Sequence, residues 1–327
     1  MKATARAHPN IALVKYWGKR DDALLLPHTG SYSVTLSGLF AETTVAFGDG
    51  RDSGELDGVP FDAKALGRVV ALLDLVRARA GITAGARVVS RSNFPTAAGL
   101  ASSAAGFAAL ALAASKAAGL PTDARSVSAL ARQGSGSACR SVQGGFCEWL
   151  RGERADGADS FAVQRHPASH WPDLRLLAAE CAAEAKAVSS RDAMRATVET
   201  SPYYAAWITD ATSELSRAND LVAARDLGAL GALCERNAWR MHATALAAEP
   251  PTCFLRPATL AVIERVAALR QGGISAAFTL DAGPNPVVLC GAGDAARVEQ
   301  ALLEAGARKV TVCAPGPDAA LCDAHLF

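Results

Sequence analysis

The first ninety residues contain hydrophobic residues at two kinds of spacing, one typical of strands and one typical of helices. Residues 31–36 and 43–47 are β-branched or alternating runs bounded by glycine, which predicts strands. Residues 57–58 (Asp-Gly) separate two further short runs, as the turn of a hairpin does. Between residues 64 and 80 the apolar side chains recur at helical spacing, and residues 87–90 again have a strand-like pattern. This region therefore predicts several strands and one long helix.

The middle of the chain alternates between small-residue loops and regular elements. Residues 104–118 are an alanine-rich helical segment, which Gly119 and Pro121 end. A second small-residue loop at residues 134–137 leads into an apolar run. The charged, glycine-containing stretch 151–159 is predicted to be a surface loop.

A new strand-like run at residues 174–179 places a domain boundary near residue 172, which divides the chain into domains 1–172 and 173–327. After this run, the second domain contains three helical patterns and three further strand-like pieces. The helical patterns cover residues 192–217, 218–247 and 257–271, and the strands cover 275–280, 286–290 and 309–313. Strands and helices mixed in this way predict an α+β protein built in two layers.

Composition and charge narrow the class of protein. The 327 residues are 50% hydrophobic, with 33 Lys and Arg against 32 Asp and Glu, as in an ordinary globular protein. A net charge of +1 gives no electrostatic reason to expect a nucleic acid or an anionic membrane as partner. The longest apolar stretch is about a dozen residues, whereas a membrane helix needs ~20. No secretory signal is apparent at the N-terminus. The eight cysteines include no closely spaced pair, and both observations favour a cytoplasmic protein with free thiols.

The loop at residues 95–104 (PTAAGLASSA) is the first segment with chemical content. Where a small-residue turn meets the start of a helix, free backbone N–H groups and the helix dipole favour a phosphate group. Ser102 and Ser103 add hydroxyls for phosphate or Mg²⁺. No Walker A sequence is present. The alternative is a helix capped by serines, which is common.

Two lysines and a tyrosine lie close together near the N-terminus. If the segment is a strand, Lys15, Trp17 and Lys19 share one face and Tyr16 faces the other, unless the chain bends at Gly18. Two ammonium groups and a phenol beside apolar walls suit a diphosphate or a carboxylate. The alternative is an edge strand whose lysines discourage aggregation.

Two further segments carry single charged residues in suggestive positions. Arg140 follows a Gly/Ser loop and has the shape for a bidentate grip on a carboxylate, with a structural ion pair as the alternative. Asp281 ends an apolar strand before a tight turn, where it could act as a base or simply form the turn.

Cys139 has no base beside it in the sequence and is expected to be a bystander thiol. His166 and His170 flank Pro167, which argues against a helical metal pair, and His242 is expected on a helix face.

Taken together, six segments resemble the diphosphomevalonate decarboxylases of the GHMP small-molecule kinase superfamily. They occur in the order of that family and lie at residues 10–19, 95–105, 134–146, 170–172, 198–202 and 281–285. The resemblance implies an ATP-dependent decarboxylation of 5-diphosphomevalonate to isopentenyl diphosphate in the mevalonate pathway, with Mg²⁺ arriving with the nucleotide. It also implies a homodimer, and a ribosomal-protein-like α/β domain that binds nucleotide, joined to a ferredoxin-like domain with the site between them.

The same resemblance implies a role for each matching residue. It implies that Asp281, Lys15 and Arg140 are the catalytic residues. The substrate-binding residues are Tyr16, Lys19, Ser135, Ser137, Ser190, Arg191 and Met194. The nucleotide-binding residues are Pro95, Ala98, Gly99, Leu100, Ala101, Ser102 and Ser103. No side-chain metal site is implied.

Two departures from the family pattern stand beside this assignment. Many relatives carry a lysine where Ala187 stands and a glycine where Ala193 stands, so diphosphate affinity or loop motion is expected to differ. Other functions remain open: a decarboxylase of the monophosphate, a kinase that phosphorylates the tertiary hydroxyl without loss of CO₂, another GHMP kinase, or a non-catalytic nucleotide-binding protein.

Overall fold

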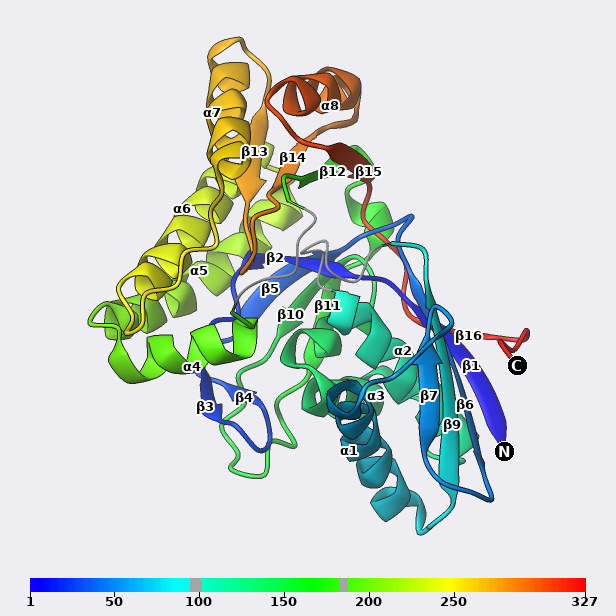
Figure 1. Ribbon diagram of the computed structural model, residues 1–327. Coiled ribbons are helices and arrows are strands. Elements are labelled where there is room, and N and C mark those ends of the chain that lie inside the picture. Colours follow the sequence, from blue (N-terminus) through cyan, green and yellow to red (C-terminus); the bar gives the residue numbers. More distant parts are fainter. Residues whose placement is uncertain (95–101, 183–187) are drawn as a thin grey trace.

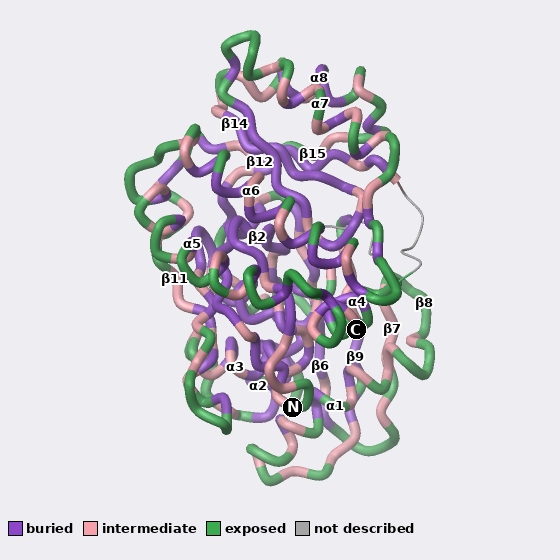
Figure 2. The backbone as a smooth tube through the Cα atoms, turned by 90° about the vertical axis from the view of Figure 1, so that its left-hand side faces the viewer, coloured by how far each residue is buried: buried purple, intermediate pink, exposed green. Residues whose placement is uncertain are grey.

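A computed structural model describes residues 1–94, 102–182 and 188–327, and its secondary structure is the mixed α+β type that the sequence predicts. Figure 1 shows one sheet near the top of the view, one at the lower right and a third sheet between them, with helices packed against the sheets. Buried residues follow the sheets and the inner faces of the helices, and exposed ones lie mostly in the connecting loops (Figure 2).

Each large sheet combines strands that are distant in the sequence. In spatial order, the six-stranded sheet contains β16 (Ala320–Cys322), β1 (Lys2–Ala7), β6 (Ala41–Gly48), β9 (Gly85–Ser92), β7 (Ser53–Leu56) and β8 (Val59–Pro60). The middle sheet contains β11 (Ala162–His166), β10 (Phe146–Trp149), β5 (Ser31–Thr35) and β2 (Asn10–Val14). The third sheet contains β13 (Ala276–Thr279), β14 (Val287–Gly291), β12 (Leu174–Glu180) and β15 (Lys309–Cys313). A small ribbon pairs β3 (Lys19–Asp21) with β4 (Leu26–Pro27).

Within the described residues the α-helices are α1 (Ala63–Ala80), α2 (Ser102–Ala117), α3 (Ala124–Gly134), α4 (Ser190–Thr200), α5 (Tyr204–Ala224), α6 (Leu227–Leu246), α7 (Pro257–Gln271) and α8 (Ala295–Glu304). Three short 3₁₀ helices are η1 (Gly136–Ser141), η2 (Ala168–His170) and η3 (Ala292–Asp294). No helix of this part of the chain is long and apolar enough to cross a lipid bilayer.

The sequence explains where α1 begins and ends. The Asp62 side chain accepts a hydrogen bond from the Ala65 N–H, which satisfies one of the free amides of the first turn. Gly81 ends the helix in the left-handed conformation, with φ of +67°. Its apolar stripe is buried in one cluster with α3 and the alanine-rich α2, and the small side chains of α2 allow close packing on the six-stranded sheet.

A single hydrophobic cluster joins the two halves of the chain. Strands β2 and β5 contribute Ile11 and Val34, while α6 and β14 contribute Leu230 and Leu289. All four side chains are almost fully buried. The packing of the middle sheet on α5 and α6 therefore fixes the end of β2 relative to β13.

The helical predictions need two corrections. The predicted helix 192–217 is two helices, because α4 ends at Thr200 and Pro202 cannot continue it. The predicted helix 218–247 is also divided, because Arg225 takes a left-handed conformation and Asp226 caps α6. Helices α3 and α8 lie where the pattern assigned no element.

The chain between β2 and β3 is not the continuous strand considered from the sequence. Strand β2 ends at Val14, and Gly18 adopts a φ of +102°. The Trp17 carbonyl accepts hydrogen bonds from the Tyr204 hydroxyl at 3.1 Å and from the Trp207 indole at 3.3 Å. Lys15 and Lys19 consequently lie on different segments rather than on one strand face.

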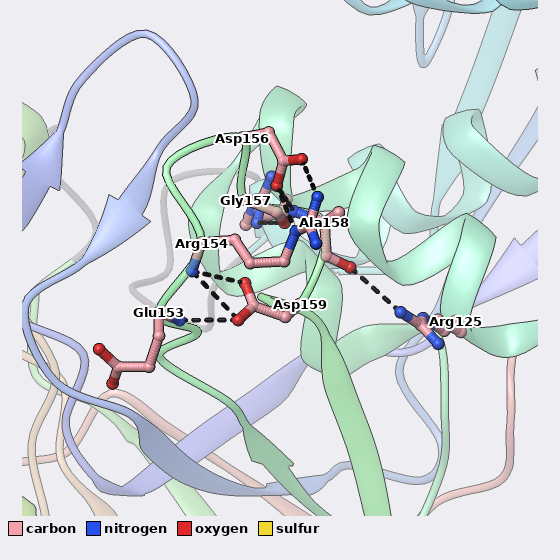
Figure 3. Close-up of polar contacts among 8 residues, drawn as sticks. Arg125, Glu153, Arg154, Asp156, Gly157, Ala158 and Asp159 are labelled. Atoms are coloured by element: carbon pink, nitrogen blue, oxygen red, sulfur yellow. Dashed lines mark hydrogen bonds and ion pairs between the residues drawn. The ribbon is translucent and has the colours of Figure 1, made fainter.

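The predicted surface loop at residues 151–159 is confirmed, and Figure 3 shows what orders it. The Asp159 carboxylate accepts hydrogen bonds from the Glu153 N–H at 2.8 Å and the Arg154 N–H at 3.1 Å. Arg154 forms an ion pair with Asp156, and Arg125 reaches the Ala158 carbonyl at 3.4 Å. These contacts are solvent-exposed, and the buried Arg132 adds a hydrogen bond to the Gly157 carbonyl at 2.8 Å, so polar contacts hold the loop.

The last strand does not follow the expected division at residue 172. Strand β16 pairs antiparallel with β1, so the end of the chain lies in the six-stranded sheet beside the N-terminus (Figure 1). The sheet of β12 to β15 is otherwise formed entirely by residues after 172.

Replacing Gly18 by alanine is predicted to lower the free energy of unfolding by roughly 3 kcal/mol or more. A Cβ at this position would lie 1.7 Å from the Tyr204 hydroxyl oxygen, in addition to the strain of the positive φ. Gly273→Ala is the matched control, since Gly273 has a φ of +84° but open space around it. Urea unfolding measures both variants. Equal losses would contradict the packing described for Tyr204.

Candidate active site

Lys15 is a buried cation at the end of β2. Its ammonium Nζ lies 2.7 Å from the Asp281 carboxylate oxygen Oδ1 and donates to the Ala12 carbonyl at 2.7 Å. The irregular register of β2 between Ala12 and Val14 lets the side chain turn back toward its own strand. Only 2% of the Lys15 side chain is exposed, against 28% for Asp281, so the pair opens to solvent on the side of the aspartate.

Asp281 lies just beyond β13, where the sequence predicted a carboxylate before a tight turn. The Gly283 N–H donates to the Asp281 carbonyl at 2.6 Å, which confirms the turn. Two residues earlier, the buried Thr279 hydroxyl donates to the Ala12 carbonyl at 3.1 Å. The ends of β2 and β13 are thus tied directly to each other, although 266 residues separate Lys15 from Asp281.

Arg140 lies in η1 and is almost fully buried. Its Nε and Nη2 donate to the Asn10 side-chain oxygen at 3.2 and 3.1 Å, and its Nη1 donates to the Ser31 hydroxyl. These contacts use one N–H on each nitrogen, so of the five N–H groups of a guanidinium one on each terminal nitrogen remains for a ligand. Burial lowers the pKa of Arg140, whereas Cys139 and Asp281 act in the opposite direction.

Tyr16 connects Lys15 to η1. Its ring packs on Trp149 with 4.7 Å between centroids, and a Cβ on Gly136 would lie 2.9 Å from the Tyr16 ring. Burial raises the pKa of the Tyr16 hydroxyl, while Arg140 and Arg191 lower it. The phenol is therefore neutral at physiological pH and lies within the field of both arginines.

Lys19 lies in a second cluster of charges next to α4. Its ammonium pairs with Asp22, and this hydrogen bond is the main cause that lowers the pKa of the Asp22 carboxyl, with smaller contributions from Arg195 and Arg191. A small pocket here is lined by Lys19, Asp22, Met194, Arg195, Val198 and Glu199. Lys19 and Met194 are thus brought together as the sequence predicted, with the exposed Arg191 within electrostatic reach.

The remaining predicted residues lie around these two clusters. The hydroxyls of Ser103, in the first turn of α2, and Ser135, at the end of α3, are 3.4 Å apart. The Ser137 carbonyl accepts from the Asn10 amide at 3.1 Å, and Ser190 begins α4. Ser102 is the first residue of α2. Six residues named from the sequence lie outside the described part of the chain: Pro95, Ala98, Gly99, Leu100, Ala101 and Ala187.

The substitution at position 193 is compatible with its place in the structure. Ala193 is buried in the first turn of α4, and its N–H donates to the Ser189 carbonyl at 3.0 Å. Alanine favours helix more than the glycine that the family pattern leads one to expect here. The start of α4 is therefore expected to be stiffer in this protein.

Sequence reasoning missed the residues that hold the catalytic candidates in place. Asn10 and Ser31 contact Arg140, whereas Asn237 and Glu214 connect to the Lys15 backbone. Asn10 carried a signal, since it is a polar residue opening an apolar strand. Asn237 and Glu214 carried none, because each lies on a helix in which polar residues are common.

His242 is on α6, as predicted, but it faces the candidate site. The imidazole is buried, packs edge-on to Phe254, and its Nε2 has no hydrogen-bond partner among the described residues. Burial and then the charge of Lys15 lower the pKa of His242 to about 4, against smaller opposing effects of the Leu280 and Asp281 carbonyls and the Asp281 carboxylate. The ring is therefore neutral at physiological pH.

Cys139 and the pair His166 and His170 were considered from the sequence, and the structure describes the surroundings of each. Burial raises the pKa of the Cys139 thiol to about 12, so it is not a nucleophile at neutral pH. His166 and His170 stack with 4.4 Å between ring centroids, but no cluster of three His, Cys, Asp or Glu residues that could hold a metal ion occurs in the described ranges.

Comparison with known proteins gives a consistent result over nearly the whole chain. A family model for the diphosphomevalonate decarboxylase-like N-terminal domain matches residues 7–162, and one for the mevalonate 5-diphosphate decarboxylase C-terminal domain matches residues 179–312. The diphosphomevalonate decarboxylase of Ganoderma lucidum is 40% identical over 310 residues, which cover 88% of this chain and 78% of that protein.

Solved structures are similarly close. A complex of a protein called MDDEF with MVAPP, AMPPCP and magnesium superposes with a TM-score of 0.93 at 40% identity, covering 99% of both chains. The mevalonate diphosphate decarboxylase of Staphylococcus aureus gives a TM-score of 0.94 at 36% identity, covering 98% of both chains.

The depressed pKa of His242 predicts a distinct pH dependence of stability. The unfolded chain takes up this proton near pH 6.5, whereas the folded protein does so only near pH 4. Stability is therefore lost as the pH falls from 6.5 to 4, by up to roughly 1.4 kcal/mol per pH unit. Urea unfolding across this range is expected to show a shallower slope for His242→Asn than for the wild type. The exposed His325→Asn is the control, and identical slopes for wild type and His242→Asn would contradict the assignment.

Proposed function

The chain belongs to the diphosphomevalonate decarboxylase family, and from this premise we propose how its own residues perform that family's reaction. The enzyme uses ATP and Mg²⁺ to convert 5-diphosphomevalonate into isopentenyl diphosphate, ADP, phosphate and CO₂ in the mevalonate pathway. Its fold is the two-domain GHMP kinase fold. The observation that carries our assignment of roles is the contact of Lys15 with Asp281. Arg140 lies within electrostatic reach of the same carboxylate.

The first step transfers a phosphoryl group to the tertiary hydroxyl of the substrate. Asp281 orients this hydroxyl and accepts its proton, and its partial exposure leaves it accessible to the substrate. Lys15 holds the carboxylate in place and offsets negative charge on the attacking oxygen as it bonds to the γ-phosphorus of ATP and ADP leaves. Burial of Lys15 strengthens this effect, because little water screens the ammonium.

The second step removes the new phosphate and CO₂ together. Phosphate leaves with the electron pair of its C–O bond, and the electrons of the breaking C–CO₂⁻ bond form the carbon–carbon double bond. Arg140 holds the carboxylate in the geometry that this elimination needs, through the two N–H groups that its contacts with Asn10 and Ser31 leave over. A guanidinium fixed on one side by buried partners is already ordered before the substrate binds.

The charged cluster at Lys19 is proposed to bind the diphosphate. Lys19, Arg191 and the Tyr16 hydroxyl supply two cations and a neutral donor, and the Ser190 hydroxyl adds a further donor. Binding would draw Lys19 away from Asp22, which is 70% exposed and can return to water. Ser135, Ser137 and Met194 are proposed as neighbours of the substrate along the same wall.

The N-terminus of α2 is proposed to bind the phosphates of ATP. Ser102 and Ser103 lie in its first turn, where the helix dipole favours negative charge, and the loop from Pro95 to Ala101 precedes them. The 3.4 Å separation of the Ser103 and Ser135 hydroxyls supports placing nucleotide and substrate side by side. Mg²⁺ bound to the nucleotide offsets charge on its phosphates.

We also propose a homodimer and a cytoplasmic location. All eight cysteines are free thiols, most of them buried, which fits a reducing compartment. The homodimer is supported only by the family resemblance, and light scattering of the purified 33.7 kDa chain would show a particle of twice that mass.

Asp281→Asn is predicted to reduce kcat by several orders of magnitude while nucleotide binding survives. The amide keeps the size of the side chain but neither accepts a proton nor pairs with the Lys15 charge. Coupled release of ADP and ¹⁴CO₂ measures kcat, and a fluorescent nucleotide measures binding. A variant that retains a tenth of wild-type turnover would contradict the role of Asp281.

Turnover of the wild-type enzyme is predicted to be fastest on the 5-diphosphate when mevalonate, its 5-phosphate and its 5-diphosphate are compared, with CO₂ and ADP released in equal amounts. Lys19→Met should raise the KM for the diphosphate about tenfold or more with a smaller effect on kcat, because a charge-assisted contact is lost. Arg297→Gln, an exposed change on α8, is the matched control. Faster turnover of the 5-phosphate, or an unchanged KM in Lys19→Met, would contradict the diphosphate site.

A further inference from the structure

We infer that Glu214 and Asn237 act as a positioning pair that fixes the backbone of Lys15 and so aims its ammonium at Asp281. The inference rests on the proposed role of Lys15. Glu214 lies on α5 and Asn237 on α6, and both are buried, with 4% and 0% exposure. Neither residue contacts Asp281 in the described structure, so their effect on catalysis would pass through Lys15.

The hydrogen bonds form one continuous chain. The Lys15 backbone N–H donates to Asn237 Oδ1 at 2.8 Å, and Asn237 Nδ2 donates to Glu214 Oε2 at 2.5 Å. A carboxylate only accepts hydrogen bonds, so it requires the amide NH₂ of Asn237 on its own side. That requirement turns the Asn237 oxygen toward Lys15. Without Glu214 the amide could rotate and present its NH₂ to the Lys15 N–H.

Lys15 needs such a partner because of where it stands. The pairing of β2 with β5 ends at Val14, opposite Tyr32, so the next amide has no strand partner. At its other end, the Lys15 side chain donates to the Ala12 carbonyl. Asn237 therefore fixes the backbone and Ala12 fixes the ammonium, which leaves the side chain little freedom to leave Asp281.

The charge of Glu214 is balanced on the side away from Lys15. Arg236 Nε donates to Glu214 Oε1 at 2.8 Å, and Arg240 Nη1 lies 3.4 Å from the same oxygen. Both arginines are part-exposed, so the buried carboxylate is paired at the surface and keeps Oε2 for Asn237. This division of its two oxygens is what a positioning role requires.

An exchange of the two functional groups tests the inference. Glu214→Gln removes the charge, and Asn237→Asp places two carboxylates together, so each single variant is expected to lower kcat about 10- to 100-fold with little change in the KM for either substrate. In the double variant, an amide at position 214 can donate to a carboxylate at 237, which still accepts the Lys15 N–H. We expect the double variant to recover kcat to within a few fold of the wild type.

The pH profile adds a second signature. Two carboxylates that share one proton regain a hydrogen bond as the pH falls, so the kcat of Asn237→Asp relative to wild type should rise toward acid pH. Asp52→Asn is the matched control: Asp52 pairs with Arg77 and accepts the Ala86 N–H, away from the site. It is expected to lower the melting temperature while leaving kcat unchanged.

The outcomes separate this inference from the proposed function. Wild-type kcat in both single variants overturns it, as does a double variant no more active than the singles, whether or not its melting temperature recovers. If a single variant does not fold, the double variant is compared with the wild type instead: a kcat within a few fold supports the inference, and a loss of tenfold or more overturns it. The proposed role of Lys15 is tested separately by Lys15→Met, and a wild-type kcat in that variant would contradict it.

Discussion

The contact between Lys15 and Asp281 is the constraint on which the site depends. It joins the end of β2 to the end of β13 across 266 residues and places a cation where almost no solvent reaches it. A buried charge is tolerable only when it is paired and hydrogen-bonded. The same packing of the middle sheet on α5 and α6 that forms the shared hydrophobic cluster holds the two strand ends together. The packing that forms this interface therefore also assembles the site.

The proposed site assigns the different chemical groups of one small substrate to separate residues. Arg140 is held from behind by Asn10 and Ser31, and the cluster at Lys19 lies on a different segment because the chain bends at Gly18. A carboxylate, a hydroxyl and a diphosphate can thus each meet a different partner. The Tyr16 ring packs on Trp149, and its hydroxyl lies within electrostatic reach of both Arg140 and Arg191.

The sequence predicted local structure better than contacts across the fold. Helix α7 was placed at its observed bounds and the hairpin at residues 57–58 was correct, because both depend on neighbours in the chain. The break at Pro202 had a local signal that the apolar pattern concealed. The sequence motifs predicted that Lys15, Arg140 and Asp281 belong to one site. No local pattern marks Asn237, Glu214 or His242, since their roles arise only when α5 and α6 pack against β2 and Asp281.

A crystal structure of the protein with 5-diphosphomevalonate, a non-hydrolysable ATP analogue and Mg²⁺ tests the central claim most directly. We expect the tertiary hydroxyl within hydrogen-bond distance of the Asp281 carboxylate, roughly 2.6–3.2 Å, with the substrate carboxylate on the terminal nitrogens of Arg140. A substrate bound with its hydroxyl away from Asp281 and its carboxylate away from Arg140 would contradict the claim.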